Sequence, residues 1–211
     1  MQQIKKLLII ANGQKENKTF IKNIAKTADF ILALDGGADI ALKAGLMPSL
    51  VIGDLDSISQ SAKNKIGQEK LLKIPRQDNT DLEKGLDFAR YFKVPNITII
   101  CASGGRLDFT LSNFSSVFNY IDKANIIFKT SPCDIFPIKK SAKFECKKGA
   151  KISLIPMGNT TGLTLKNLKY SLKNASFKIG QSAISNIALK NTFEVLFKTG
   201  QILVIVNHIK N

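Results

Sequence analysis

Apolar residues in the first two thirds of the chain form short runs that alternate with helical patterns. The runs predict buried strands at 4–11, 30–34, 50–52, 71–74, 97–101 and 124–128. The stretches between them predict helices at 19–26, 40–44, 58–67, about 80–92 and about 107–121. Strands that alternate with helices predict a mostly parallel sheet covered on both faces, which is a Rossmann-like three-layer α/β domain.

The pattern changes after about residue 130. Ser131-Pro132 and Pro137 mark a connection, and short apolar segments then recur between Gly or Asn turns. These segments lie at 150–155, 161–165, 193–197 and 202–206. No long helical stretch interrupts them, so the sequence predicts a small β-sandwich. We therefore expect two domains, an α/β domain at 1–130 and a β domain at 131–211.

Hydropathy and cysteine usage limit the surroundings in which the chain works. No apolar run approaches the roughly 20 residues that a bilayer-spanning helix needs, so no membrane partner is expected. The three cysteines, Cys101, Cys133 and Cys146, are widely spaced and include no Cys-x-x-Cys. This pattern argues against disulfides and zinc and predicts a reducing, cytoplasmic location.

The charge of the chain is strongly positive, at +15, but it does not favour nucleic acid as a partner. Only three of the 31 basic residues are arginines, which are the side chains that read bases most often, and the lysines are scattered. The acidic residues are more informative, because eight of the eleven aspartates lie between Asp35 and Asp108. Any metal chemistry is therefore expected in the first domain.

The stretch Gly53-Asp54-Leu55-Asp56-Ser57 follows the apolar run 50–52 directly. In an extended segment, side chains at 54 and 56 point to the same side, where two like charges repel each other. A divalent cation removes that penalty, and Mg²⁺ is usually held by one or two carboxylates together with substrate phosphates. The alternative is a strand-end turn whose aspartates cap the next helix.

Further acidic residues follow predicted strands in the same way. Ligands of open α/β sheets bind beyond the carboxyl ends of the strands, so these side chains are expected to converge there. The residues in such positions are Asp35, Asp54, Asp56, Asp78, Asp81 and Asp108.

Two segments add cationic and backbone groups that suit phosphate. Asp81 and Lys84 are three residues apart at a predicted helix start, which Asn79 or Thr80 can cap, and they share one helix face. The Gly104-Gly105 turn allows close backbone approach, and Arg106 can then fork onto phosphate oxygens. An ordinary surface ion pair and a plain turn are the alternatives. The sequence has no Walker motif and no Gly-x-Ser-x-Gly, and its single histidine is His208, which excludes a P-loop kinase and a Ser/His/Asp hydrolase.

In order and spacing, four motifs of the first domain together resemble the thiamine pyrophosphokinase family. They are Asp35-Gly36-Gly37-Ala38, Gly53-Asp54-Leu55-Asp56-Ser57, Gln77-Asp78-Asn79-Thr80-Asp81 with Lys84, and Gly104-Gly105-Arg106-Leu107-Asp108 with Asn113. The resemblance continues in the second domain at 153–158, at 167–172 and at Ser185-Asn186.

The resemblance implies Mg²⁺-dependent transfer of pyrophosphate from ATP to thiamine, which gives thiamine diphosphate and AMP. It implies a homodimer whose thiamine sites lie between the α/β domain of one subunit and the β domain of the other. It assigns the metal and the chemistry to Asp54, Asp56 and Asp81, with Asp108 in the same cleft. It places the nucleotide near Asp35, Ser57, Gln77, Asp78, Thr80, Lys84 and Arg106. It places thiamine near Tyr170, Ser185 and Asn186, and an aromatic face at Tyr170 suits a cationic ring.

The chain departs from the family pattern at two positions, where Leu55 replaces a frequent Phe and Phe109 replaces a frequent His. The second change removes a polar group near the expected site. Two other functions remain open at this point: a pyrophosphokinase for another small alcohol, such as a pterin, and a non-catalytic regulator that binds thiamine or nucleotide. A nucleic-acid binder is a weaker third.

Overall fold

The computed structural model describes residues 3–75 and 78–209. The chain divides into two compact units, Met1–Ser131 and Pro132–Asn211. The first is an α/β unit with a parallel sheet and the second is built from antiparallel strands, so the expected fold class is confirmed. Within the described ranges, no helix combines the length and the apolar character required to cross a bilayer.

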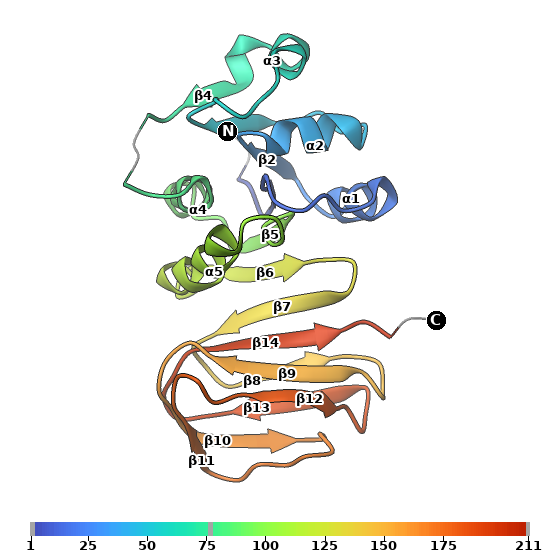
Figure 1. Cartoon of the computed structure of the whole chain (residues 1–211), viewed down its shortest axis with the longest axis vertical. Coiled ribbons are helices and arrows are strands. Elements are labelled where there is room, and N and C mark those ends of the chain that lie inside the picture. Colours follow the sequence, from blue (N-terminus) through green and yellow to red (C-terminus); the bar gives the residue numbers. More distant parts are fainter. Residues whose placement is uncertain (1–2, 76–77, 210–211) are drawn as a thin grey trace. The chain divides into compact units, whose positions relative to one another are not determined.

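The sheet of the first unit has the strand order β6-β5-β1-β2-β3-β4, and every neighbouring pair is parallel (Figure 1). The strands are β1 (Lys6–Ile10), β2 (Phe30–Leu34), β3 (Leu50–Gly53), β4 (Leu71–Lys73), β5 (Asn96–Ile100) and β6 (Asn125–Lys129). The helices are α1 (Lys18–Ala25), α2 (Gly37–Lys43), α3 (Gln60–Ile66), α4 (Asp81–Tyr91) and α5 (Leu107–Ser116). Short 3₁₀ turns follow at Gln68–Lys70 and Val117–Asn119.

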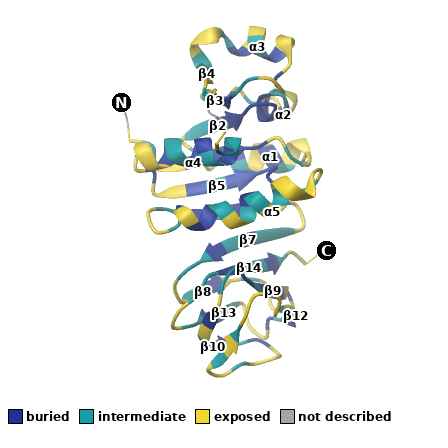
Figure 2. Ribbon diagram, turned by 60° about the vertical axis from the view of Figure 1, so that its left-hand side comes forward, coloured by how far each residue is buried: buried dark blue, intermediate teal, exposed yellow. Residues whose placement is uncertain are grey.

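Side-chain alternation along the strands decides which helices cover which face of this sheet. Leu8 and Ile10 of β1 pack with α1 and α2, whereas Ile9 points to the other face. There Gly85 lets α4 approach closely, since a Cβ at Gly85 would lie 2.9 Å from Leu34 and 3.6 Å from Ile9. Figure 1 shows α1 and α2 on one side of the sheet and α4 and α5 on the other. The strands between them are mostly buried, as Figure 2 shows.

The order in which the strands are added to this sheet reverses at β1. The strands β2, β3 and β4 extend from one side of β1, and β5 and β6 extend from the other. The loops after β1 and β5 start as neighbours, with the Gly13 N–H bound to the Cys101 carbonyl at 2.7 Å and the Gln14 N–H bound to the Ser103 carbonyl at 2.8 Å, and they then lead to α1 and α5 on opposite faces of the sheet (Figure 1). Such a switch point is where open α/β sheets bind ligands.

The second unit consists of two antiparallel sheets, with the orders β12-β9-β14-β7 and β11-β10-β13-β8. Its strands are β7 (Cys133–Ile138), β8 (Ala142–Glu145), β9 (Lys151–Pro156), β10 (Thr160–Lys166), β11 (Ala175–Phe177), β12 (Ala183–Ile187), β13 (Thr192–Leu196) and β14 (Ile202–Asn207). Both sheets contribute to one core, in which Leu154 and Val204 meet Leu163 and Phe193. This arrangement is a β-sandwich.

The expected connection around Pro137 is wrong. Pro137 lies inside β7, paired with Leu203 of β14. A proline removes one N–H, which a strand tolerates where that group is not needed for pairing. The boundary signal therefore comes from Ser131-Pro132 alone.

Candidate active site

The loops at the carboxyl edge of the first unit hold residues in strained backbone conformations. Asp35 after β2, Leu55 after β3 and Cys101 after β5 have φ values of 45°, 65° and 56°. Residues other than glycine adopt this region at a cost, and the surrounding structure must hold them there. Such strain clusters at functional sites, and here it marks three loops of one edge.

Asp35 is the buried member of the acidic group, with 4% of its surface exposed. Both of its carboxylate oxygens accept a hydrogen bond from the Ser57 N–H, each at 3.1 Å, so Asp35 ties the loop after β3 to the end of β2. Burial raises the pKa of Asp35, and the negative charges of Asp54 and Asp81 raise it further. A concentration of negative charge therefore faces this edge.

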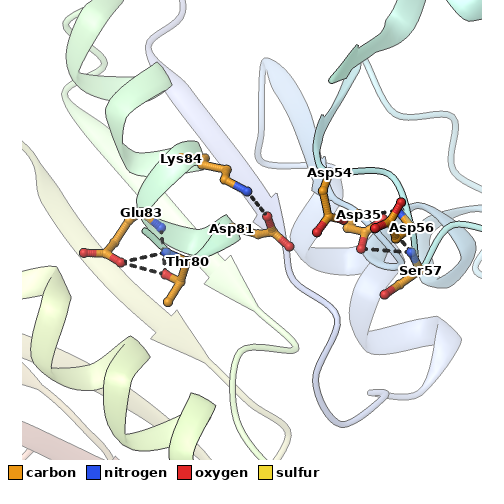
Figure 3. A network of polar contacts seen from close by, with 8 residues as sticks. All are labelled: Asp35, Asp54, Asp56, Ser57, Thr80, Asp81, Glu83 and Lys84. Carbon is orange, nitrogen blue, oxygen red and sulfur yellow. Dashed lines mark hydrogen bonds and ion pairs between the residues drawn. The ribbon is translucent and has the colours of Figure 1, made fainter. Parts of the chain in front are cut away.

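Asp54 and Asp56 belong to a turn rather than to an extended segment. The strand ends at Gly53, Leu55 is left-handed, and Asp54 Oδ1 accepts a hydrogen bond from the Asp56 N–H at 3.1 Å. The extended geometry expected for positions 54 to 56 is therefore wrong. Figure 3 shows Asp54 beside Asp35 and facing Asp81 across the gap between the β3 loop and the start of α4.

The start of α4 is fixed by a capping box. The Thr80 hydroxyl accepts a hydrogen bond from the Glu83 N–H at 3.2 Å, and the Glu83 carboxylate accepts one from the Thr80 N–H at 2.9 Å. The expected cap is thereby confirmed at Thr80. One turn in, Lys84 Nζ donates to Asp81 Oδ1 at 2.9 Å, with 5% of the Lys84 side chain and 33% of the Asp81 side chain exposed.

Arg106 and Asp108 form an exposed pair on the loop after β5. Arg106 donates to the two Asp108 carboxylate oxygens at 2.5 and 3.2 Å, and these hydrogen bonds lower the pKa of Asp108. The Arg106 guanidinium lies 4.4 Å from the centre of the Phe109 ring. Asn113 is buried and donates to the Ala102 carbonyl at 2.8 Å, which ties α5 to the same loop.

Two adjoining cavities collect most of these groups. One, of about 510 Å³, is lined by Asp35, Ser57, Thr80, Asp81 and Arg106 among others. The second, of about 380 Å³, is lined by Asp54, Asp78, Thr80, Asp81 and Lys84 among others. Thr80 and Asp81 face both cavities, whereas Asp56 and Asp108 line neither.

A larger hollow of about 1020 Å³ also lies in the first unit, but its lining is mainly apolar. Phe30, Leu50, Ile52 and Phe88 line it, and it includes none of the aspartates that the motifs single out. The two smaller cavities are therefore the better candidates for phosphate chemistry.

Sequence reasoning missed one side of the 510 Å³ cavity. Asn12 and Gln14, on the loop after β1, line it together with Gly13. The rule that ligands bind beyond the carboxyl ends of the strands applies to β1 as well as to β2 and β3, so it could have found them. Gln77, which was expected to contact nucleotide, lies outside the described residues.

The residues expected near thiamine lie in the second unit and differ in exposure. Tyr170 is 60% exposed, and Ser185 is exposed and left-handed, with φ of 57°. Asn186 is only 2% exposed, and its amide binds the main chain of Tyr170.

The acidic residues of the first unit provide hard oxygen donors, which suit Mg²⁺. Across residues 3–75 and 78–209, no three His, Cys, Asp or Glu side chains stand close enough together to hold a metal ion. Magnesium needs only one or two carboxylates when substrate phosphates complete its coordination. Burial is the main cause of the raised pKa of Asp35, and the nearby negative charges of Asp54 and Asp81 add to it. The donor set therefore fits Mg²⁺ that arrives with a nucleotide.

Comparison with known proteins gives matches along nearly the whole chain. Residues 21–128 match the family model described as thiamin pyrophosphokinase, catalytic domain, and residues 133–203 match the model described as thiamin pyrophosphokinase, vitamin B1 binding domain. A thiamine pyrophosphokinase of Bacillus subtilis is 27% identical over 213 residues, which cover 96% of this chain and 98% of the relative. Thiamin pyrophosphokinase 1 of Caenorhabditis elegans is 24% identical, with 90% of this chain and 83% of that protein covered.

Solved structures show the same fold. The crystal structure of thiamine pyrophosphokinase from Bacillus subtilis has a TM-score of 0.84 at 24% identity and covers 98% of this chain and 100% of its own. The thiamin pyrophosphokinase of Candida albicans has a TM-score of 0.85 at 20% identity, with 97% and 89% covered.

Proposed function

The chain belongs to the thiamin pyrophosphokinase family, and we propose that it transfers pyrophosphate from ATP to the hydroxyl of thiamine, which yields thiamine diphosphate and AMP. The observation that supports this most directly is the pair of family models matched in succession, one to each structural unit. The acidic edge of the first unit supplies the chemistry that such a transfer needs.

In the proposed reaction the thiamine hydroxyl attacks the β-phosphorus of ATP in line, and AMP leaves. Transfer of this kind depends mainly on positioning and on neutralising charge. Lys84 and Arg106 would contact phosphate oxygens, with Thr80, Gln77 and Asp78 beside the nucleotide. Asp35 holds the loop at Ser57, so that the carboxylates beyond β3 keep their places.

Asp54, Asp56 and Asp81 are the residues that would hold Mg²⁺. When bound, the ion supplies positive charge that offsets the charge of the triphosphate. Asp56 is solvent-exposed and lines neither cavity, so its assignment rests on the family resemblance and on its place two residues after Asp54.

The proton of the thiamine hydroxyl needs an acceptor, and Asp81 and Asp108 are the candidates. Asp81 faces both cavities, whereas Asp108 lines neither. The hydrogen bonds from Arg106 also lower the pKa of Asp108, which weakens it as a base. Asp81 likewise accepts a hydrogen bond from a cation, Lys84, so its place in both cavities is the observation that favours it.

An assay for AMP tests the proposal. With ATP and Mg²⁺ present, AMP should appear when thiamine is added and stay at background without it. A pyrophosphokinase for a pterin-like alcohol would instead release AMP only with that alcohol. A non-catalytic regulator would bind Mg²⁺-nucleotide or thiamine but release no AMP. A nucleic-acid binder would show DNA affinity that falls steeply with salt.

The metal assignment is tested by Asp56→Asn, which keeps the shape of the side chain and removes its charge. We expect a loss of at least ~100-fold in rate, since a lost charge contact in the transition state is worth several kcal/mol. In a titration with Mg²⁺, the variant should need a higher Mg²⁺ concentration than the wild type to reach half of its maximal rate. Near-normal turnover would remove Asp56 from the metal site.

We further propose that the active form is a homodimer in which thiamine lies between the α/β domain of one subunit and the β domain of the other. The exposed apolar side chains Tyr170, Ile179 and Ile184 support a role for the second unit in association. Mixing Asp56→Asn protein with Tyr170→Ala protein tests this arrangement, at a thiamine concentration well below the KM of the Tyr170→Ala variant, where neither variant alone is active. If subunits exchange freely, about half of the dimers contain one subunit of each variant, and one of the two sites in such a dimer has both the native Asp56 and the native Tyr170. About a quarter of all sites would then be intact, so activity should reappear. Two variants that stay inactive after proven subunit exchange would refute a shared site.

A further inference from the structure

The amide of Asn186 is buried and makes three hydrogen bonds to main chain. Asn186 belongs to β12, and 2% of its surface is exposed. Its Oδ1 accepts hydrogen bonds from the N–H groups of Tyr170 and Ile187, each at 2.9 Å, and its Nδ2 donates to the Tyr170 carbonyl at 2.7 Å. The side chain therefore satisfies both main-chain groups of Tyr170, as a neighbouring strand residue would.

The main-chain pairing between the two segments stops before Tyr170, which explains why a side chain binds the main-chain groups of Tyr170. The segments 167–169 and 187–189 pair through main chain, with Lys169 N–H bound to the Ile187 carbonyl and Leu189 N–H bound to the Asn167 carbonyl, both at 2.9 Å. On its other edge β12 pairs with β9 and changes register between Ala183 and Asn186. The main chain of Asn186 is thereby committed to β9, and its amide continues the pairing toward Tyr170.

The neighbouring Ser185 shows how the backbone accommodates this change of register. It adopts the left-handed conformation, with φ of 57°, and its N–H donates to Ser153 Oγ at 3.1 Å. The contact to β9 holds the turn that points the Asn186 amide inward. Ser185 itself stays exposed.

Tyr170 combines a fixed main chain with a free ring. Tyr170 is 60% exposed, and Lys169 Nζ lies 5.5 Å from the centre of its ring. An aromatic side chain held in this way keeps its position without being buried. Preorganisation of this kind raises affinity, because less freedom is lost when a ligand binds.

We propose that Asn186 is a positioning residue, which fixes the main chain of Tyr170 so that its ring is presented to thiamine, and that Asn186 does not itself touch the ligand. This inference rests on the proposed function, in which Tyr170 contacts thiamine. It assigns Asn186 a task different from the direct contact that the family resemblance implies.

Amide hydrogen exchange followed by NMR tests the contact without any ligand. In the wild type the Tyr170 amide should be protected. Asn186→Ala should speed its exchange at least ~10-fold, while Lys169, whose amide is bound to the Ile187 carbonyl, should stay protected as an internal reference. Asn186→Asp keeps an acceptor for the Tyr170 N–H but puts a carboxylate oxygen where Nδ2 donates to the Tyr170 carbonyl, so the Tyr170 amide should be less protected than in the wild type and more protected than in Asn186→Ala. It serves as the second variant if Asn186→Ala folds poorly. An unprotected Tyr170 amide in the wild type would overturn the proposal.

Steady-state kinetics test the consequence for thiamine. Asn186→Ala should raise KM for thiamine at least ~10-fold and leave KM for ATP within about 2-fold, since only the thiamine contact depends on Tyr170. Asn207→Ala is the matched control, because Asn207 also donates one amide hydrogen bond to main chain, at 3.0 Å to the Lys151 carbonyl. Both of its KM values should be unchanged.

A double-variant cycle separates positioning from direct contact. If Asn186 acts through Tyr170, then adding Asn186→Ala to Tyr170→Ala should raise KM for thiamine no further. Additive effects would show that Asn186 touches thiamine and would overturn the proposal. An effect of Tyr170→Ala without any effect of Asn186→Ala would also overturn it while leaving the proposed function intact. Failure of the proposed function is recognised separately, because the wild type would then release no AMP with thiamine.

Discussion

The ion pair between Asp81 and Lys84 can be removed one partner at a time, and the two partners are not equivalent. The Lys84 side chain is 5% exposed, whereas the Asp81 side chain is 33% exposed. Asp81→Asn leaves a buried ammonium beside a neutral amide. Lys84→Met leaves a carboxylate that water still reaches, and the flexible Met chain fills the same space. We therefore expect Asp81→Asn to lower stability more than Lys84→Met does.

The size of the difference follows from the burial of the pair. Removing one partner of a fully buried pair costs about 3–5 kcal/mol. Partial exposure of Asp81 reduces this to about 2 kcal/mol for Asp81→Asn, and solvation of the remaining carboxylate keeps Lys84→Met below ~1 kcal/mol. In a chain of this length, 2 kcal/mol corresponds to a fall of about 4–8 °C in Tm. The double variant carries neither charge and should return to within ~1 kcal/mol of the wild type.

Calorimetry of the four proteins in Mg²⁺-free buffer measures this, and the AMP assay on the same samples measures function. All three variants should lose at least ~100-fold in rate, while only Asp81→Asn should lose marked stability. Arg90→Met is the control, because Arg90 and Asp87 have the same spacing on the same helix, but the Arg90 side chain is 59% exposed. Equal losses from the two single variants, or a double variant whose loss is their sum, would refute the reasoning.

Three further changes test other parts of the chain. Asp35→Asn should raise Tm at neutral pH. Folding raises the pKa of Asp35, so the ionised carboxylate at neutral pH lowers the stability of the folded state. This loss of stability grows as the pH rises from the unfolded-state pKa to the folded-state pKa, and Asn, which does not ionise, avoids it. The gain should vanish below pH ~3, where Asp35 is protonated in both the folded and the unfolded state, and a gain that persists there would contradict this cause. Lys169→Gln should lower KM for thiamine about 2–5-fold, because the Lys169 ammonium lies over the Tyr170 ring and repels a second cation there; an unchanged KM would place thiamine elsewhere. Phe109→Ala should raise KM for ATP by a similar factor, since the ring supports Arg106 at 4.4 Å. A rise in KM for thiamine without a rise in KM for ATP would show that Arg106 does not contact the nucleotide.

The α/β unit was predictable because each of its elements has a local cause. The run 30–34 is apolar throughout and is buried on both faces of a parallel sheet, so the expected strand and β2 have the same limits. Thr80 and Glu83 have the spacing of a capping box, which the structure confirms. The start of α2 at Gly37 was placed too late, since two glycines conceal a helix start from a propensity argument.

The sandwich was less predictable in detail. Its last strands were expected from their apolar runs, but β7 contains a proline and β12 has a change of register with exposed residues at its centre. The burial of β7 alternates from Ile135 to Ile138, but these four residues are all apolar, and the burial of β12 does not alternate. Neither sequence therefore shows the polar–apolar alternation that predicts a strand. The task of Asn186 was hidden for a related reason. A sequence shows an amide, and only the fold decides whether that amide faces a ligand or main chain.

The candidate site also explains two features that destabilise the first unit in the absence of ligands, which are charge repulsion and strained backbone. Like charges meet at one edge, where burial and the charges of Asp54 and Asp81 raise the pKa of Asp35, and the same edge holds the left-handed residues Leu55 and Cys101. Neither feature stabilises the unit by itself, and a sequence selected for stability alone would relieve both. A cation bound there with its phosphates would relieve the charge repulsion and leave the strained loops in place as a preformed binding surface. The location of these two features, at the carboxyl ends of β2, β3 and β5, is therefore independent physical support for phosphate chemistry at this edge.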